Sequence, residues 1–141
     1  MAYQEGIFEV EFSALPERLR LVRRLVEAAA RLAGCGRESA AEIVIAVNEA
    51  CMNVIQHAYR GDRAGRMVLK IWTAGGSIVY RLEDFAEPAD HSAIRPRNLD
   101  DIRPGGLGTH FMAALMDDCR FGHLEGGGGN FLEMRKTIGR G

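Results

Sequence analysis

The hydrophobic and polar positions follow a period of two at the start of the chain and a helical period after it. Residues 6–13 alternate apolar and polar side chains, mostly Glu, which is typical of a half-buried strand. Pro16 then stands at a position that the first turn of a helix tolerates, and Gly34 ends the helical pattern. The apolar stripe of this predicted helix consists of Leu19, Val22, Leu25, Val26 and Ala29.

The rest of the chain alternates between apolar runs and glycine-rich turns. A largely apolar helix is predicted from Glu38 to Tyr59, where Gly61 stops it. Two pairs of strands are expected, one joined at Gly75-Gly76 and the other at Gly126–Asn130. The predicted strands are 67–73, 77–84, 119–124 and 130–138, and a third helix is predicted from 106 or 107 to about 118.

These elements predict an α+β fold with the order β-α-α-β-β-α-β-β. Adjacent hairpins beside segregated helices favour a two-layer sandwich over a parallel doubly wound sheet. Residues 85–104 show no period and hold three of the four prolines, so we expect a loop there, long enough to serve as a lid. One domain spanning 1–141 is expected. The aromatic residues predicted to lie in the core are Phe8, Phe12, Trp72 and Tyr80.

Composition narrows the class of protein. The chain has 141 residues, and 18 Lys and Arg against 19 Asp and Glu give a net charge of −1, which argues against nucleic-acid binding. No apolar run approaches the roughly 20 residues that cross a bilayer, so no membrane span is expected. The three cysteines form no C-x-x-C pair, which argues against a disulfide framework or a zinc site. We therefore expect a soluble, cytoplasmic domain.

A polar line runs along the apolar second helix. Glu49, Asn53 and His57 are spaced four apart, which places them on one helical face. Glu and Asn one turn apart can offer oxygen ligands to Mg²⁺, and such a Glu can also accept a proton from an attacking hydroxyl. The alternative is that these residues are polar side chains at the edge of a core helix. The spacing alone leaves both interpretations open.

Two further features carry candidate chemistry. Asp84 ends an apolar strand, where its carboxylate could accept a hydrogen bond from an exocyclic amine such as that of adenine, or could start a turn. The turn formed by Gly106, Leu107, Gly108 and Thr109 precedes a predicted helix, where converging backbone N–H groups suit a polyphosphate. Such a turn also serves packing, so each feature has a structural alternative.

Three segments in this order resemble the Bergerat-fold ATPases. Residues 47–59, Val-Asn-Glu-Ala-Cys-Met-Asn-Val-Ile-Gln-His-Ala-Tyr, resemble the N-box of that superfamily. Leu82-Glu83-Asp84 resembles the strand leading into its first glycine box, and Pro104–His110 resembles the second glycine box. Within the superfamily, the short chain and its element order are similar to the anti-sigma factor serine kinases of the RsbW and SpoIIAB type. The resemblance covers about residues 8–138.

The resemblance implies an ATP-dependent serine/threonine protein kinase with a Bergerat ATP-binding fold. Asn53 would coordinate Mg²⁺, Glu49 would be the general base, and Asp84 would bind the adenine amine. Residues 106–109 would lie close to the phosphates, with 85–104 as the ATP lid. The implied partners are a sigma factor and a STAS-domain antagonist that is phosphorylated in partner switching; family members often bind their partners as a homodimer.

Two positions depart from the family pattern. Ala86 stands where the first glycine box carries Gly, and its Cβ could obstruct a positive φ or a close approach to the base. Asn130 stands near the start of the last strand, where the family often has a Thr that contacts adenine. Asn130 can replace it if its amide points inward. A non-catalytic module that only binds a partner is the rival hypothesis, and a histidine-kinase ATPase module is a third.

Overall fold

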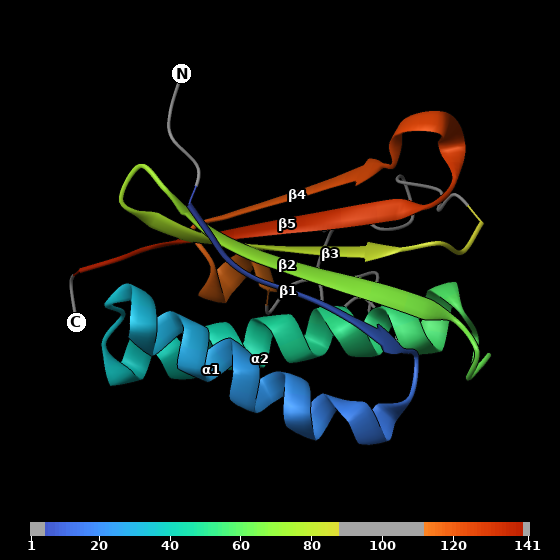
Figure 1. The fold of residues 1–141 in the computed structure, drawn as a ribbon, viewed down its shortest axis with the longest axis horizontal. Coiled ribbons are helices and arrows are strands. Elements are labelled where there is room, and N and C mark those ends of the chain that lie inside the picture. The colour runs from blue at the N-terminus through green and yellow to red at the C-terminus, as the bar shows by residue number, and fades with distance from the viewer. Residues whose placement is uncertain (1–4, 88–111, 140–141) are drawn as a thin grey trace.

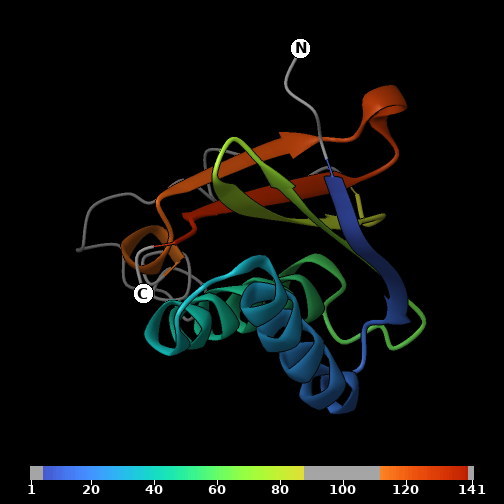
Figure 2. The same cartoon turned by 60° about the vertical axis from the view of Figure 1, so that its left-hand side comes forward.

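The computed structural model describes residues 5–87 and 112–139, which form two layers. A five-stranded sheet with the order β1-β2-β3-β5-β4 has helices α1 and α2 on one face (Figures 1 and 2). All neighbouring strands are antiparallel. The elements are β1 Glu5–Ser13, η1 Pro16–Arg18, α1 Leu19–Ala33, α2 Arg37–Asn53, η2 Val54–Ala58, β2 Arg66–Ala74, β3 Ser77–Asp84, β4 Asp118–His123, η3 Glu125–Gly127 and β5 Asn130–Thr137. The predicted α+β sandwich is confirmed.

The predicted third helix falls mostly outside the described residues. Residues 112–115 are helical, and β4 already begins at Asp118, which the sequence pattern assigned to the helix. Asp118 pairs with Arg135 of β5, so the sheet extends one residue further than the hydrophobic pattern indicates. The predicted hairpins are both present, one joining β2 to β3 and the other joining β4 to β5.

Helix α1 is held to the sheet by its apolar stripe and by one buried hydrogen bond. Leu19, Val22, Val26 and Ala29 are buried, as their spacing predicts. The Tyr80 hydroxyl of β3 donates to the carbonyl oxygen of Val26 over 3.0 Å. Gly34 ends α1 in the left-handed conformation, with a φ of 108°, which a residue without a Cβ adopts at no steric cost.

Phe8 differs from the prediction. It lies on the helix-facing side of β1, opposite the buried Ile71 of β2, yet 45% of its surface is exposed. Strand β1 is an edge of the sheet and has a neighbouring strand on one side only, so the ring lacks cover on the other. Tyr80 is fully buried as predicted, and Phe12 is partly buried against the core.

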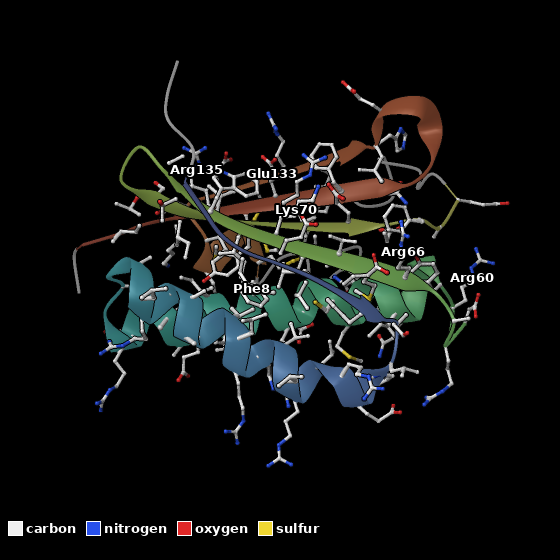
Figure 3. The ribbon with its side chains drawn as sticks, in the orientation of Figure 1. Phe8, Arg60, Arg66, Lys70, Glu133 and Arg135 are labelled. Carbon is white, nitrogen blue, oxygen red and sulfur yellow. The ribbon has the colours of Figure 1, made fainter. Side chains whose placement is uncertain are left out.

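The opposite face of the sheet carries charged side chains. Lys70, Glu133 and Arg135 lie on the side away from the helices (Figure 3). Arg81 joins Glu133 over 3.0 Å, and its guanidinium lies 4.0 Å from the centre of the Phe131 ring. Trp72 is half-buried on this face rather than in the core between the layers, because it pairs in register with Val79 and not with a helix-facing residue.

Candidate functional site

Glu49 and Asn53 lie one turn apart on one side of α2, and both are half-buried. Two neighbours show which side this is. Glu42, two turns before Glu49, forms an ion pair of 3.7 Å with Lys136 of β5. Asn48 lies on the other side, where its side chain accepts a hydrogen bond of 3.0 Å from Arg23 of α1. Glu49 and Asn53 therefore lie on the side of α2 that faces away from α1.

His57 differs from Glu49 and Asn53 in its helix type and its exposure. After Asn53 the helix changes to the π-helix η2, Val54–Ala58, in which each turn takes in one more residue than an α-helical turn. The next side chains are therefore rotated away from the positions that a regular α-helix would give them. His57 is exposed, while Ile55 is buried. The spacing of four places Glu49 and Asn53 on one side of α2, and the third residue of this line, His57, lies in the π-helix and is exposed.

Asp84 ends β3 and is 5% exposed. Its Oδ1 accepts hydrogen bonds from the Asn130 side-chain amide over 2.9 Å and from the Ala86 backbone N–H over 3.1 Å. Its Oδ2 accepts none from the parts of the chain that the structure describes. Burial raises the pKa of Asp84 above its ordinary value, and these two hydrogen bonds oppose that shift. One oxygen is thus held in place, and the other remains available to a donor.

Tyr59 connects the end of the second helix to the residue after Asp84. Its hydroxyl accepts a hydrogen bond of 2.8 Å from the Phe85 backbone N–H and donates one to the Arg66 carbonyl oxygen. The Arg66 guanidinium also lies 4.1 Å from the centre of the Phe85 ring. Strand β3 and the α2–η2 helix end at the same side of the molecule (Figure 1). Asp84 and Asn53 are therefore brought to one end of the two layers.

Ala86 is accommodated without backbone strain. Outside glycine, the only described residue with a positive φ is Arg60, so Ala86 does not need the conformational freedom of glycine. Its N–H closes a turn onto the Asp84 side chain instead. The Asn130 amide points inward, toward Asp84 and the carbonyl oxygen of Glu87. The observation that motivated the non-catalytic alternative is thus weaker than the sequence suggests.

Gly129 fits against Asp84 only because it has no side chain. A Cβ at Gly129 would lie 2.0 Å from the Asp84 carbonyl oxygen, whereas one at Gly128 would meet nothing within 4 Å. We expect Gly129→Ala to lower the free energy of unfolding by about 3 kcal/mol, because backbone must move to admit the methyl group. Urea denaturation monitored by circular dichroism would measure the loss. Gly128→Ala is the control, and equal midpoints for the two variants would contradict the close contact.

The predicted glycine turn, Gly106, Leu107, Gly108 and Thr109, lies outside the described residues, as does most of the predicted lid. The helical turn that follows, at 112–115, includes the fully buried Met112. Met116, just after this turn, is also buried in the core.

The sequence and the fold identify the family. The sequence profile of the histidine kinase-like ATPase domain family matches residues 12–136. The chain belongs to this family. No helix among the described residues is long and apolar enough to cross a membrane.

The chain is similar to several curated members of the histidine kinase-like ATPase family. It is 28% identical over 120 residues to the serine-protein kinase RsbW of Bacillus licheniformis, covering 79% of this chain and 75% of the relative. It is 28% identical over 134 residues to RsbW of Listeria monocytogenes, covering 89% and 85%. These matches confirm the resemblance to the RsbW type.

Solved structures of the family share the fold. The RsbU and RsbW domains of a Mycobacterium tuberculosis protein match with a TM-score of 0.65 and 20% identity, over 95% of this chain and 33% of that one. The histidine kinase domain of a blue-light activated histidine kinase from Erythrobacter litoralis matches with a TM-score of 0.54 and 17% identity, over 87% and 60%. This chain thus spans a third of the first protein, and the likeness to both is one of fold.

The described side chains include oxygen atoms of the kind that a magnesium ion bound to a nucleotide would use. Among the described residues, no three His, Cys, Asp or Glu side chains gather into a metal site. Mg²⁺ commonly takes one or two protein oxygens and completes its shell with phosphates and water. The Asn53 amide and the Glu49 carboxylate supply oxygen atoms of that kind, and Asp84 offers an acceptor for an amine.

The sequence did not predict the hydrogen bond between Tyr59 and Phe85 or the one between Asn130 and Asp84. From the sequence, Tyr59 is predicted only as the end of the second helix and the last residue of the N-box-like segment. No periodicity could show that its hydroxyl reaches Phe85, 26 positions further along the chain. For Asn130, the element order predicts two hairpins but not that β3 pairs with β5, and it is this pairing that sets Asn130 directly opposite Asp84.

Proposed function

We propose that this chain is an ATP-dependent serine/threonine protein kinase that acts as an anti-sigma regulatory factor. The curated relatives are named serine-protein kinases, and the family is one of ATPase domains. One structural observation supports the proposal: β3, which ends at Asp84, and α2, whose last turns carry Glu49 and Asn53, end at the same side of the molecule. A purely structural role does not require that combination.

Each residue has a proposed task in phosphoryl transfer. Asp84 accepts a hydrogen bond from the adenine amine, and the backbone of Gly106, Leu107, Gly108 and Thr109 lies along the phosphates. Asn53 holds Mg²⁺, which neutralises phosphate charge when it is bound. Glu49 accepts the proton of a serine hydroxyl as that oxygen bonds to the γ-phosphorus and the bond to the ADP oxygen breaks. The protein's contribution is mainly positioning and charge stabilisation.

The proposed partners follow from the RsbW type. The kinase holds a sigma factor until an unphosphorylated STAS-domain antagonist displaces it, and phosphorylation of the antagonist on serine or threonine reverses the exchange. A homodimer is the proposed binding form. Direct contact with nucleic acid is not part of the proposal, because the chain is nearly neutral with a net charge of −1.

Transfer of phosphate from labelled ATP tests this function. The chain is incubated with Mg²⁺, ATP and STAS-domain proteins from the same organism, and mass spectrometry locates the modified residue. We expect one serine or threonine of one such protein to be phosphorylated. Binding of ATP without transfer to any of them would contradict the proposed substrate. Absence of Mg²⁺–ATP binding up to millimolar concentration in calorimetry would contradict the kinase and favour the non-catalytic module.

A further inference from the structure

Two different elements position Asp84, one through its carboxylate and the other through the peptide that follows it. From β5, the Asn130 amide donates to Oδ1 over 2.9 Å. From the end of η2, Tyr59 accepts a hydrogen bond from the peptide N–H immediately after Asp84 over 2.8 Å. The first contact fixes the rotation of the carboxylate, and the second fixes the backbone that carries it. Both contacts come from positions that are more than 20 residues away in the sequence.

Asn130 has a geometry suited to orienting Asp84. It is 7% exposed and stands opposite Asp84 in the β3–β5 ladder. Its side-chain nitrogen carries two hydrogens, and the structure gives it two acceptors, Asp84 Oδ1 and the carbonyl oxygen of Glu87 at 3.3 Å. Its N–H groups are thus directed at protein oxygens. Asn130 consequently acts on a bound base through Asp84 instead of donating to the base itself.

Tyr59 is fixed on both sides, so it can hold Phe85 in a defined place. Its hydroxyl donates to the Arg66 carbonyl oxygen, and its ring packs so closely on Gly65 that a Cβ there would lie 2.6 Å from ring atoms. The ring and the hydroxyl are therefore both set by the turn between η2 and β2. Phe85 is set in turn by the hydroxyl and by the Arg66 guanidinium over its ring.

We propose that Asn130 and Tyr59 are positioning residues that aim Oδ2 of Asp84 at the bound base and thereby select a purine that carries an amine. This rests on the proposed ATP binding. With Oδ1 occupied by two donors, the oxygen left for a ligand is Oδ2, a pure acceptor when the carboxylate is ionised. A base with an amine matches that acceptor, and a base without one leaves it unpaired.

The test compares two nucleotides that differ only in the amine. Calorimetry gives the Kd of Mg²⁺–ATP and of the purine nucleoside triphosphate lacking the 6-amino group, for the wild type, Asn130→Leu, Tyr59→Phe and Asp84→Asn. Asn130→Leu keeps the size of the side chain but removes the donor. We expect the wild type to bind ATP more tightly than the amine-free analogue. Each positioning variant should raise the Kd of ATP about tenfold and leave the Kd of the analogue unchanged. In a double variant with Asp84→Asn, neither Asn130→Leu nor Tyr59→Phe should weaken the binding of ATP further.

Tyr80→Phe is the matched control for Tyr59→Phe. It also removes one tyrosine hydroxyl that holds backbone, here the bond to Val26 at 3.0 Å, but it lies between the sheet and α1. We expect it to lower the melting temperature without changing the preference for ATP. If Asn130→Leu does not fold, Asn130→Ala replaces it.

Three results would overturn the inference. If a positioning variant weakens the binding of both nucleotides equally, the substituted residue has a structural role only. If the variant keeps the wild-type preference for ATP, the residue does not aim Asp84. If ATP binds and Asp84→Asn abolishes the preference while both positioning variants retain it, the positioning roles fail but the proposed function stands. If the wild type binds neither nucleotide, the proposed function itself fails, and the inference with it.

Discussion

Glu49→Gln should abolish phosphoryl transfer while leaving Mg²⁺–ATP binding intact. The amide keeps the size of the side chain but cannot accept the hydroxyl proton, so we expect the rate of transfer to a STAS-domain protein to fall about 10³-fold. Single-turnover kinetics with labelled ATP measure the rate, and calorimetry measures the affinity. If the variant still transfers phosphate at a rate near that of the wild type, Glu49 is not the general base.

Glu42→Gln is the control for this change. Glu42 lies two turns earlier on the same side of α2 and is likewise half-buried, but its carboxylate pairs with Lys136. The loss of that pair should cost little stability, because such partly exposed ion pairs contribute about 0–1 kcal/mol. Transfer by Glu42→Gln should remain at the wild-type rate. A comparable loss in both variants would indicate a general effect of charge on this side of the helix.

Asp84→Asn should weaken ATP binding about 100-fold and leave the fold intact. The single oxygen of the new amide can still accept from Asn130 and from the Ala86 N–H, as Oδ1 does now. The amide nitrogen then stands where Oδ2 was, so a donor faces the adenine amine in place of an acceptor. Calorimetry measures the affinity. Unchanged binding of ATP would contradict the role of Asp84.

The same substitution should change how stability depends on pH. Burial raises the folded-state pKa of Asp84, so the folded chain holds this proton more tightly than the unfolded chain does. The wild type therefore loses stability as the pH rises from the ordinary carboxyl pKa through the raised one, and the loss persists to neutral pH. Asp84→Asn lacks this loss, so its stability relative to the wild type should increase between acid and neutral pH in thermal denaturation.

For Asp117→Asn, stability relative to the wild type should decrease between acid and neutral pH, the opposite of Asp84→Asn. The Thr137 backbone N–H donates to Asp117 over 2.7 Å and holds the pKa of that carboxyl below its ordinary value. The stabilisation is present above the ordinary carboxyl pKa and is lost as the pH falls through the lowered one. The variant should thus be less stable than the wild type at neutral pH and equal to it in acid. Its ATP affinity should not change.

The layers of this fold could be predicted from sequence because its elements have regular periods. Alternation predicts β1 correctly, and the spacing of Leu19, Val22 and Val26 predicts the buried side of α1. Strand β1 also shows the limit of such patterns. Period two assigns Phe8 to the helix-facing side, but whether the ring is covered depends on β1 being an edge of the sheet. That position follows from the strand order, which local patterns do not contain.

The sequence predicts which residues could form the candidate site, but it does not predict the hydrogen bonds that these residues make. The i, i+4 rule places Glu49 and Asn53 on one side of the helix, but no local signal shows that the helix changes to a π-helix before the exposed His57. Likewise, the concern over Ala86 assumes that its position needs a positive φ. The backbone instead turns onto the Asp84 side chain, a solution that depends on the buried carboxylate and its partner Asn130.

The structure of the chain with Mg²⁺ and ADP tests the central claim most directly. We predict that the adenine amine lies about 3 Å from Asp84 Oδ2. We also predict that the Asn53 amide oxygen ligates the magnesium ion and that Glu49 faces the space beyond the β-phosphate. If ADP binds elsewhere, or if Glu49 and Asn53 point into solvent away from its phosphates, the kinase mechanism is wrong and the family membership alone remains.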